Sequence, residues 1–292
     1  MKTYQSLIQT GKRFQIMEDT ALAHSRLNAG CYTAHYNQMN GQFWFEEFKN
    51  NHDAIIDLPS PEFKRLTSEM INFLRPETRA KFADKGFLYK RSALLYGNPG
   101  TGKTVLVNRV IQEVVKNGGV VIFGTDPRLI PKAFAVLDDL QPETMALVVL
   151  EEFDEMIKQY GEGIFLNLLD GEVQKQNVMY LATTNYLSKV PKRMIRPGRM
   201  SSILEVKYPN TACRRQYLGL KMGLDFAPLN DWVQSTNGLS VDELKEVVQS
   251  VYIFEEEIGD VVSRIKKTRD FTPIEESEDL FDDEDYDEKG LI

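Results

Sequence analysis

Apolar residues fall into two patterns that alternate along the chain. Short continuous runs at residues 94–96, 120–123, 146–150, 178–182 and 203–206 predict buried strands. Apolar positions at helical spacing cover residues 61–74, 105–115 and 164–169, and residues 53–59 predict a further short strand closed by proline. Strands that alternate with amphipathic helices predict an α/β fold, in which a parallel sheet is flanked by helices.

The same pattern divides the chain into four expected parts. Residues 1–50 have no long period, and we expect an N-terminal arm or small domain whose aromatic cluster at 41–48 is local core rather than a binding surface. Residues 51–208 carry the alternating strands and helices. Residues 209–268 have helical spacing, which predicts a small all-helical lid domain. Residues 269–292 are expected to be an acidic disordered tail, because they are too charged to bury a core.

Residues 97–104 fit the pattern G-x-x-x-x-G-K-[ST] (Walker A) at every fixed position. A strand, a glycine loop and a helix follow in order, so that backbone N–H groups and the helix N-terminus can converge on phosphate oxygens. We expect Lys103 to reach the β and γ phosphates of ATP and Thr104 to hold Mg²⁺. The alternative is a glycine turn without a ligand. The predicted ATP-binding residues of this P-loop are Gly97, Asn98, Pro99, Gly100, Thr101, Gly102, Lys103, Thr104 and Val105.

The strand at 146–150 ends in carboxylates, at the position where parallel sheets place their ligand sites. This pattern predicts a Walker B motif. Glu151 is assigned to Mg²⁺, and Glu152 to the water that attacks the γ-phosphate. The alternative is an acidic helix N-terminus that complements the helix dipole, a role that Asp154 can fill as well.

Two further segments carry groups suited to phosphate. Asn185 is the polar tip of the apolar strand predicted at 178–185, and its amide can hydrogen-bond the γ-phosphate or the attacking water if the strands are neighbours. Otherwise it closes a turn. Arg196 and Arg199 flank a Pro-Gly turn before the last strand, and their guanidinium groups can pair phosphate oxygens bidentately. A solvated turn is the alternative there.

Composition and charge narrow the class of protein. No apolar run approaches the roughly 18 residues of a membrane helix, and the start has no signal-peptide core, so we expect a soluble cytoplasmic protein. Cys31 and Cys213 are far apart and are expected to be free thiols. The formal net charge is -8, but ten of the acidic residues lie at 275–288. The rest of the chain holds 35 basic and 33 acidic residues. This nearly neutral body disfavours nucleic acid as the main partner.

Taken together, the four motifs in this order and spacing resemble the AAA family of ATPases over about residues 55–260. Residues 90–97, 150–154 and 166–171 are most similar to the branch of the mitochondrial complex III assembly chaperone, although its membrane helix has no counterpart in this sequence. The resemblance implies a homo-oligomeric ring, hexamer or heptamer, with nucleotide bound between subunits. It also implies that Asn185 is sensor 1 and that Arg196 and Arg199 are arginine fingers for the neighbour's γ-phosphate.

Residues 124–131 lack the aromatic-apolar-Gly pore loop of unfoldases, so passage of a substrate through a central pore stays open. The expected function is that of a ring-forming ATPase that uses ATP and Mg²⁺ to remodel or move a protein partner, as a chaperone does. Two alternatives stay open as well: a nucleotide-switched loader or motor on nucleic acid, and a structural factor in which ATP holds an assembly together.

Overall fold

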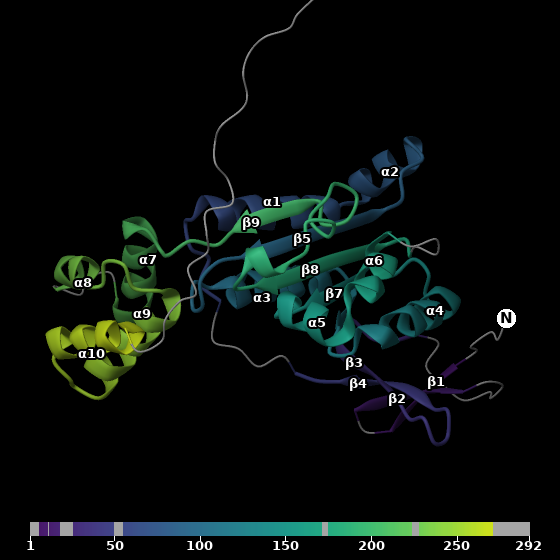
Figure 1. The fold of residues 1–292 in the computed structure, drawn as a ribbon, viewed down its shortest axis with the longest axis horizontal. Coiled ribbons are helices and arrows are strands. Elements are labelled where there is room, and N and C mark those ends of the chain that lie inside the picture. The colour runs from purple at the N-terminus through teal and green to yellow at the C-terminus, as the bar shows by residue number, and fades with distance from the viewer. Residues whose placement is uncertain are drawn as a thin grey trace, which may run out of the picture.

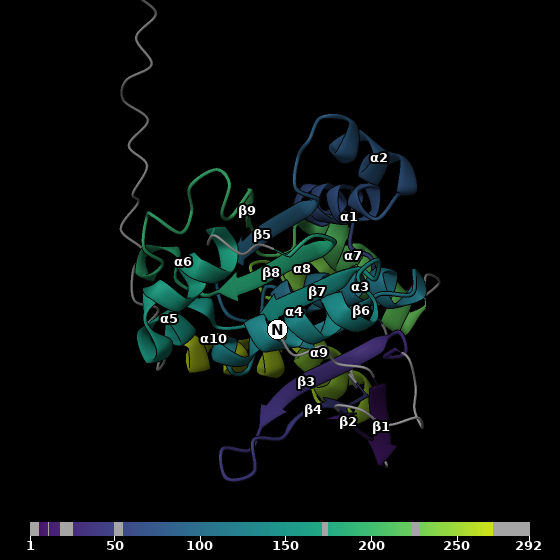
Figure 2. The ribbon, with the colours of Figure 1, turned by 90° about the vertical axis from the view of Figure 1, so that its right-hand side faces the viewer.

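The structure is a computed structural model that describes residues 6–10, 12–17, 26–49, 55–170, 175–223 and 228–270. The strands of these residues form one sheet in the order β1-β2-β4-β3-β6-β7-β8-β5-β9 (Figures 1 and 2). Its central strands are β5 (Lys90–Tyr96), β6 (Val120–Phe123), β7 (Ala146–Leu150), β8 (Val178–Thr184) and β9 (Ser202–Glu205). Every pair among these neighbours is parallel, as the apolar runs predicted.

Helices cover both faces of the central sheet. Helices α1 (Pro61–Phe73) and α3 (Lys103–Lys116) pack on one face, and α4 (Ile130–Leu140), α5 (Phe153–Tyr160) and α6 (Glu162–Asp170) pack on the other. Helix α2 (Pro76–Asp84) follows α1 and buries none of its residues. Along β5, Leu94 belongs to one core and Ala93 and Leu95 to the other, because successive side chains point to opposite faces. The predicted α/β fold is confirmed.

Four N-terminal strands extend this sheet beyond β6. They are β1 (Ser6–Thr10), β2 (Arg13–Met17), β3 (Gly30–Tyr36) and β4 (Phe43–Glu47), and β3 pairs with β6 in parallel while the others pair antiparallel. Phe43 and Phe45 are buried in the same core as Phe14 and Tyr32. The interpretation of the aromatic cluster as core is confirmed for these two residues.

The C-terminal part is helical, and Figure 1 shows it to one side of the sheet. It contains α7 (Thr211–Met222), α8 (Leu229–Ser235), α9 (Val241–Val247), a π-helical turn η3 (Val248–Ile253) and α10 (Ile258–Asp270). Its core is built from apolar residues of all five elements, among them Leu218, Val233, Leu244 and Val261. The predicted acidic tail from residue 271 onward lies outside the described residues.

The short strand predicted at 53–59 is wrong for the part that the structure describes. Residues 55–60 belong to no strand. Instead Ile56 and Leu58 pack against the core of the helical part, and the side chain of Gln216 donates a hydrogen bond to the carbonyl of Asp57 at 2.7 Å. The apolar residues of this segment are therefore buried by helices rather than by a sheet. In the described residues, every helix is too short or too polar to cross a bilayer.

Candidate nucleotide site

The predicted P-loop, acidic tip and Asn185 meet at one edge of the sheet. Strands β7, β8 and β5 are neighbours, with Tyr96 opposite Thr184 and Leu150 opposite Ala182. Their carboxyl ends therefore lie side by side. The P-loop leaves β5 after Tyr96, Glu151 follows β7, and Asn185 follows β8 directly.

Glycine is required in the P-loop for two physical reasons. At Gly97 the carbonyl oxygen of Val206 lies 2.3 Å from where a Cβ would stand, so no side chain fits. Gly100 and Gly102 have φ of +75° and +99°, in the left-handed region that other residues rarely adopt. Thr101 steadies the turn by donating its hydroxyl to the carbonyl of Asn98 at 2.9 Å. The result is a tight loop that packs closely against Val206 and Ser240.

Lys103 is buried at the start of α3 and folds back over the loop. Its ammonium donates to the carbonyl oxygens of Gly97 at 2.6 Å and Asn98 at 2.9 Å. Burial lowers the pKa of Lys103 to about 8, although the nearby carboxylates of Asp242 and Asp154 act in the opposite direction. A phosphate is the ligand that would compensate this desolvated cation.

The acidic tip of β7 separates into buried and exposed carboxylates. Asp154 is 7% exposed and accepts a hydrogen bond from the hydroxyl of Thr184 at 2.6 Å, which joins β8 to α5. Glu151 and Glu152 are exposed. The pKa of Glu151 is raised, mainly because the surrounding protein desolvates its carboxylate and to a smaller extent because Glu152 carries a like charge.

Glu152 has backbone strain at the point where chemistry is predicted. Its φ is 50° and its ψ is 51°, a left-handed conformation that costs a residue other than glycine about 1–3 kcal/mol. The strained residue is the N-cap of α5, yet its side chain makes no capping hydrogen bond. Simple capping therefore does not account for Glu152.

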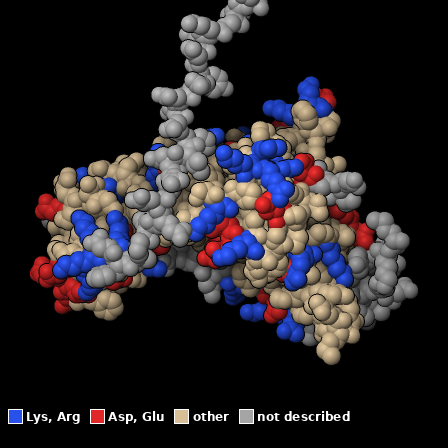
Figure 3. All heavy atoms as spheres, viewed as in Figure 1, with Lys and Arg blue, Asp and Glu red and all other residues tan. Residues whose placement is uncertain are grey.

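Arg196 and Arg199 do not join this group. Both lie on the loop before β9, where Arg196 is exposed and Arg199 contacts Asp170 at 3.3 Å and the carbonyl of Arg193 at 2.6 Å. Figure 3 shows Lys and Arg side chains gathered over this loop. Its basic residues from 189 to 199 are Lys189, Lys192, Arg193, Arg196 and Arg199.

A cavity of about 200 Å³ opens beside the P-loop, and sequence reasoning missed most of its lining. Thr104 and Val105 form one wall, and Ile56, Tyr217 and Val241 form others. The cavity thus lies between the segment before α1, the P-loop and the helical part. No local motif marks Ile56 or Tyr217, because each reaches the cavity only through the fold.

The helical part also contacts the P-loop directly. The N–H groups of Val241 and Asp242 donate to the carbonyl of Gly100 at 2.9 and 3.2 Å. Ser240 begins α9 as one half of a capping box with Glu243, whose carboxylate is paired with Arg269. The helical part is therefore joined to the loop that would carry the phosphates.

The residues present fit a nucleotide triphosphate with Mg²⁺. The glycine loop has the tight, positive-φ conformation that only glycine adopts readily, the buried Lys103 folds over it, and a cavity lies alongside. Among the described residues, no group of three or more His, Cys, Asp or Glu could hold a metal on its own. Mg²⁺ takes one or two protein oxygens and completes its shell with water and phosphate. Thr104 and Glu151 would supply those oxygens.

Comparison with known proteins shows that the residues forming this site are similar to those of one ATPase family. Residues 93–208 match the ATPase family associated with various cellular activities (AAA). The matched residues run from β5 through β9 and include the P-loop, the acidic tip and both arginines. Over these residues the chain is similar to an AAA ATPase domain. The match supports ATP hydrolysis by these residues, in agreement with the enzyme class predicted from the sequence.

Relatives of this chain include a proteasome regulatory subunit and an ATP-dependent zinc metalloprotease. It is 27% identical over 191 residues to a 26S proteasome regulatory subunit 4 homolog of Arabidopsis thaliana. The aligned residues cover 57% of this chain and 42% of the relative. It is 27% identical over 180 residues to an ATP-dependent zinc metalloprotease FtsH of the Aster yellows witches'-broom phytoplasma, covering 54% and 26%. The chain thus spans less than half the length of these two curated relatives.

Proposed function

We propose that this chain binds ATP with Mg²⁺ at the P-loop, hydrolyses it in a ring of like subunits, and uses the energy to remodel a protein partner. The observation that carries the proposal is the buried ammonium of Lys103. It lies in a glycine loop beside Asp154 and next to the strand tips that carry Glu151 and Asn185.

Each side chain has a role that follows from its place. Lys103 and the N–H groups of the P-loop bind the β and γ phosphates, and Thr104 with Glu151 would hold Mg²⁺, which neutralises charge on the phosphate oxygens. Glu152 orients the attacking water, and Asn185 hydrogen-bonds that water or the γ-phosphate. The cavity beside Val105 takes the base.

The position of the arginines supports a site shared between subunits. The carbonyl oxygen of Arg199 accepts a hydrogen bond from the hydroxyl of Ser92. Ser92 lies five residues before Gly97, so an extended strand separates the two residues by about 17 Å. That distance exceeds the length of an arginine side chain. We therefore assign Arg199, together with Arg196 on the same loop, to the nucleotide of the next subunit in a proposed hexamer or heptamer.

The partner is proposed to be a protein, on the names of the proteasomal and FtsH relatives and on the nearly neutral body of the chain. A chaperone-like role in the cytoplasm, close to that of the complex III assembly chaperone, is the finer form of the proposal. Nucleic acid is not favoured, because a loader or motor on nucleic acid needs a broader excess of positive charge.

The test uses two variants with opposite expected effects. Glu152→Gln should bind ATP, form the ring and stop hydrolysis, because the water is no longer oriented. Arg199→Ala should bind ATP as the unmodified chain does and lose hydrolysis. Sedimentation in the presence of ATP measures ring formation, and release of phosphate measures hydrolysis. Full turnover by a monomeric Arg199→Ala protein would contradict the shared site.

A further inference from the structure

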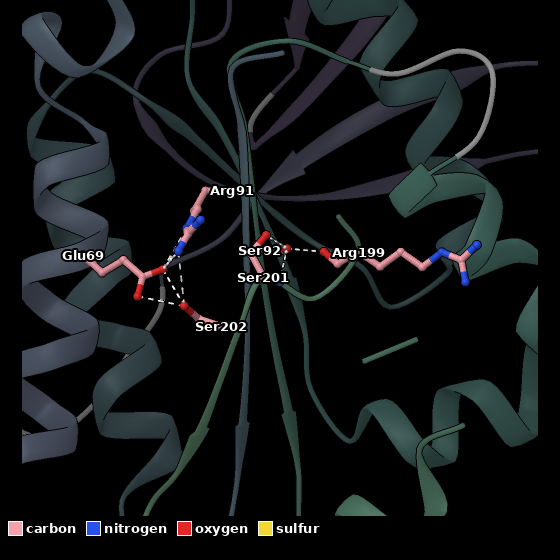
Figure 4. A network of polar contacts seen from close by, with 6 residues as sticks. All are labelled: Glu69, Arg91, Ser92, Arg199, Ser201 and Ser202. Atoms are coloured by element: carbon pink, nitrogen blue, oxygen red, sulfur yellow. Dashed lines mark hydrogen bonds and ion pairs between the residues drawn. The ribbon is translucent and has the colours of Figure 1, made fainter. Parts of the chain in front are cut away.

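The hydroxyl of Ser92 joins β5 to the loop that carries Arg199 (Figure 4). Ser92 is 1% exposed, and its Oγ donates a hydrogen bond to the carbonyl oxygen of Arg199. The N–H of Ser201 donates to the same Oγ at 2.9 Å, and the Oγ of Ser201 lies 3.1 Å away. A hydroxyl has one hydrogen to donate and two lone pairs. These three contacts use all of them.

The side chain acts where the strand pairing stops. The register between β5 and β9 begins with Ala93 opposite Ser202, so backbone pairing does not reach Ser201 or Arg199. Ser92, one residue before the register begins, supplies hydrogen bonds to those two residues instead. Met194 and Met200 anchor the loop in the core, at 0% and 2% exposure. Ser92 thus fixes the main chain at Arg199 itself.

The guanidinium of Arg199 has partners other than those of its main chain. Figure 4 shows the carbonyl of Arg199 turned toward Ser92 and the side chain extending away from it. The side chain is 25% exposed, its ion pair with Asp170 spans 3.3 Å, and it donates a hydrogen bond to the carbonyl oxygen of Arg193 at 2.6 Å. A partly exposed ion pair contributes roughly 0–1 kcal/mol, and a phosphate offers the guanidinium charge-assisted hydrogen bonds in exchange for these two partners.

We propose that Ser92 is a positioning residue for hydrolysis: it sets the place from which Arg199 reaches the nucleotide of the neighbouring subunit. The inference rests on the proposed function. A misplacement of 1 Å at a reacting group can lower a rate by roughly 100-fold, so loss of this anchor should be visible in turnover. Ser92 itself touches neither nucleotide nor water.

A mixing experiment separates the two sides of the shared site. Lys103→Ala chains supply arginines but bind no ATP, and Arg199→Ala chains bind ATP but supply no arginine at position 199. Mixed rings of the two should hydrolyse ATP although neither does alone. Adding Ser92→Val to the Lys103→Ala chain should lower this recovered activity roughly tenfold, with ATP affinity of the Arg199→Ala chain unchanged. Ser92→Thr has the same shape as Val but keeps a hydroxyl, and it should retain the recovered activity.

A matched control removes a neighbouring buried hydroxyl. Ser202 is 4% exposed and its Oγ donates to Glu69 at 2.6 Å, on the opposite side of β5 from the arginine loop in Figure 4. Ser202→Ala in the Lys103→Ala chain should leave the recovered activity within about twofold, even if it lowers thermal stability as much as Ser92→Val does.

The outcomes are separable. Equal recovery with Ser92→Val and Ser92→Thr would overturn the role of Ser92 and leave the shared site intact. An equal loss with Ser202→Ala would reduce Ser92 to a contributor to stability and would also overturn its role. No recovery by the unmodified pair would overturn the shared site, and the role of Ser92 with it.

Discussion

The N–H of Val241 donates a hydrogen bond to the carbonyl oxygen of Gly100 at 2.9 Å, so the first turn of α9 lies on the P-loop. This contact joins two segments that are far apart in sequence. It closes one side of the cavity that we assign to the base. We therefore predict that nucleotide binding and the position of the helical part are coupled through Gly100.

Gly100→Ala should weaken both the fold and ATP binding. A Cβ at this position would lie 2.8 Å from the Oγ of Ser240, and the φ of +75° is strained for alanine. The expected loss is about 1–3 kcal/mol in the free energy of unfolding, measured by urea denaturation, with a weaker affinity for ATP in titration calorimetry. Gly163→Ala is the control, because nothing lies within 4 Å of a Cβ there. Equal effects of the two substitutions would argue against the coupling.

Thr184→Val should uncouple β8 from the acidic tip. It keeps the shape of the side chain but removes the donor to the buried carboxylate of Asp154. Leaving that acceptor without its donor should cost about 1–3 kcal/mol in unfolding free energy and should lower turnover, because Asp154 lies near Lys103. Thr183→Val is the control, since Thr183 is 6% exposed and makes no side-chain hydrogen bond among the described residues. If both variants behave alike, Asp154 does not depend on Thr184.

The capping carboxylate of α9 should make the helical part sensitive to acid. Burial by itself would raise the pKa of Glu243, but hydrogen bonds from Arg269 and Ser240 lower it overall. A lowered pKa in the folded state means that the stabilisation is complete above the ordinary glutamate pKa and is lost as pH falls through the lowered value. Unfolding of the unmodified chain should therefore depend more steeply on pH below about 4.5 than unfolding of Glu243→Gln does. Parallel pH curves for the two would contradict this assignment.

Local sequence was sufficient for the parts of the site that are contiguous. The P-loop was predicted because Gly97 to Thr104 carry their geometry in eight consecutive residues, and the buried strands because apolar runs do not depend on their partners. The order of the parallel strands then places Asn185 beside the loop. The roles assigned to Glu151, Glu152, Asn185 and the arginines stay predictions.

Contacts between distant segments were not predictable in this way. Strand β3 adds to β6 although residues 1–50 showed only an aromatic cluster, because sheet pairing is decided by a partner that local pattern does not name. The segment that contains Ile56 was expected to be a strand, because its apolar residues suit burial by a sheet as well as by the helices that cover them. The anchoring of Arg199 by Ser92 is likewise a consequence of the β5–β9 register and not of either motif.

The central claim is that Lys103 and its loop bind ATP for hydrolysis. The most direct measurement is phosphate release from ATP by the purified full chain with Mg²⁺, with EDTA, and with the Lys103→Ala substitution. The account predicts turnover only in the first case, together with loss of ATP binding in Lys103→Ala. Undiminished turnover by Lys103→Ala, or failure of the unmodified chain to bind ATP with Mg²⁺, would contradict it.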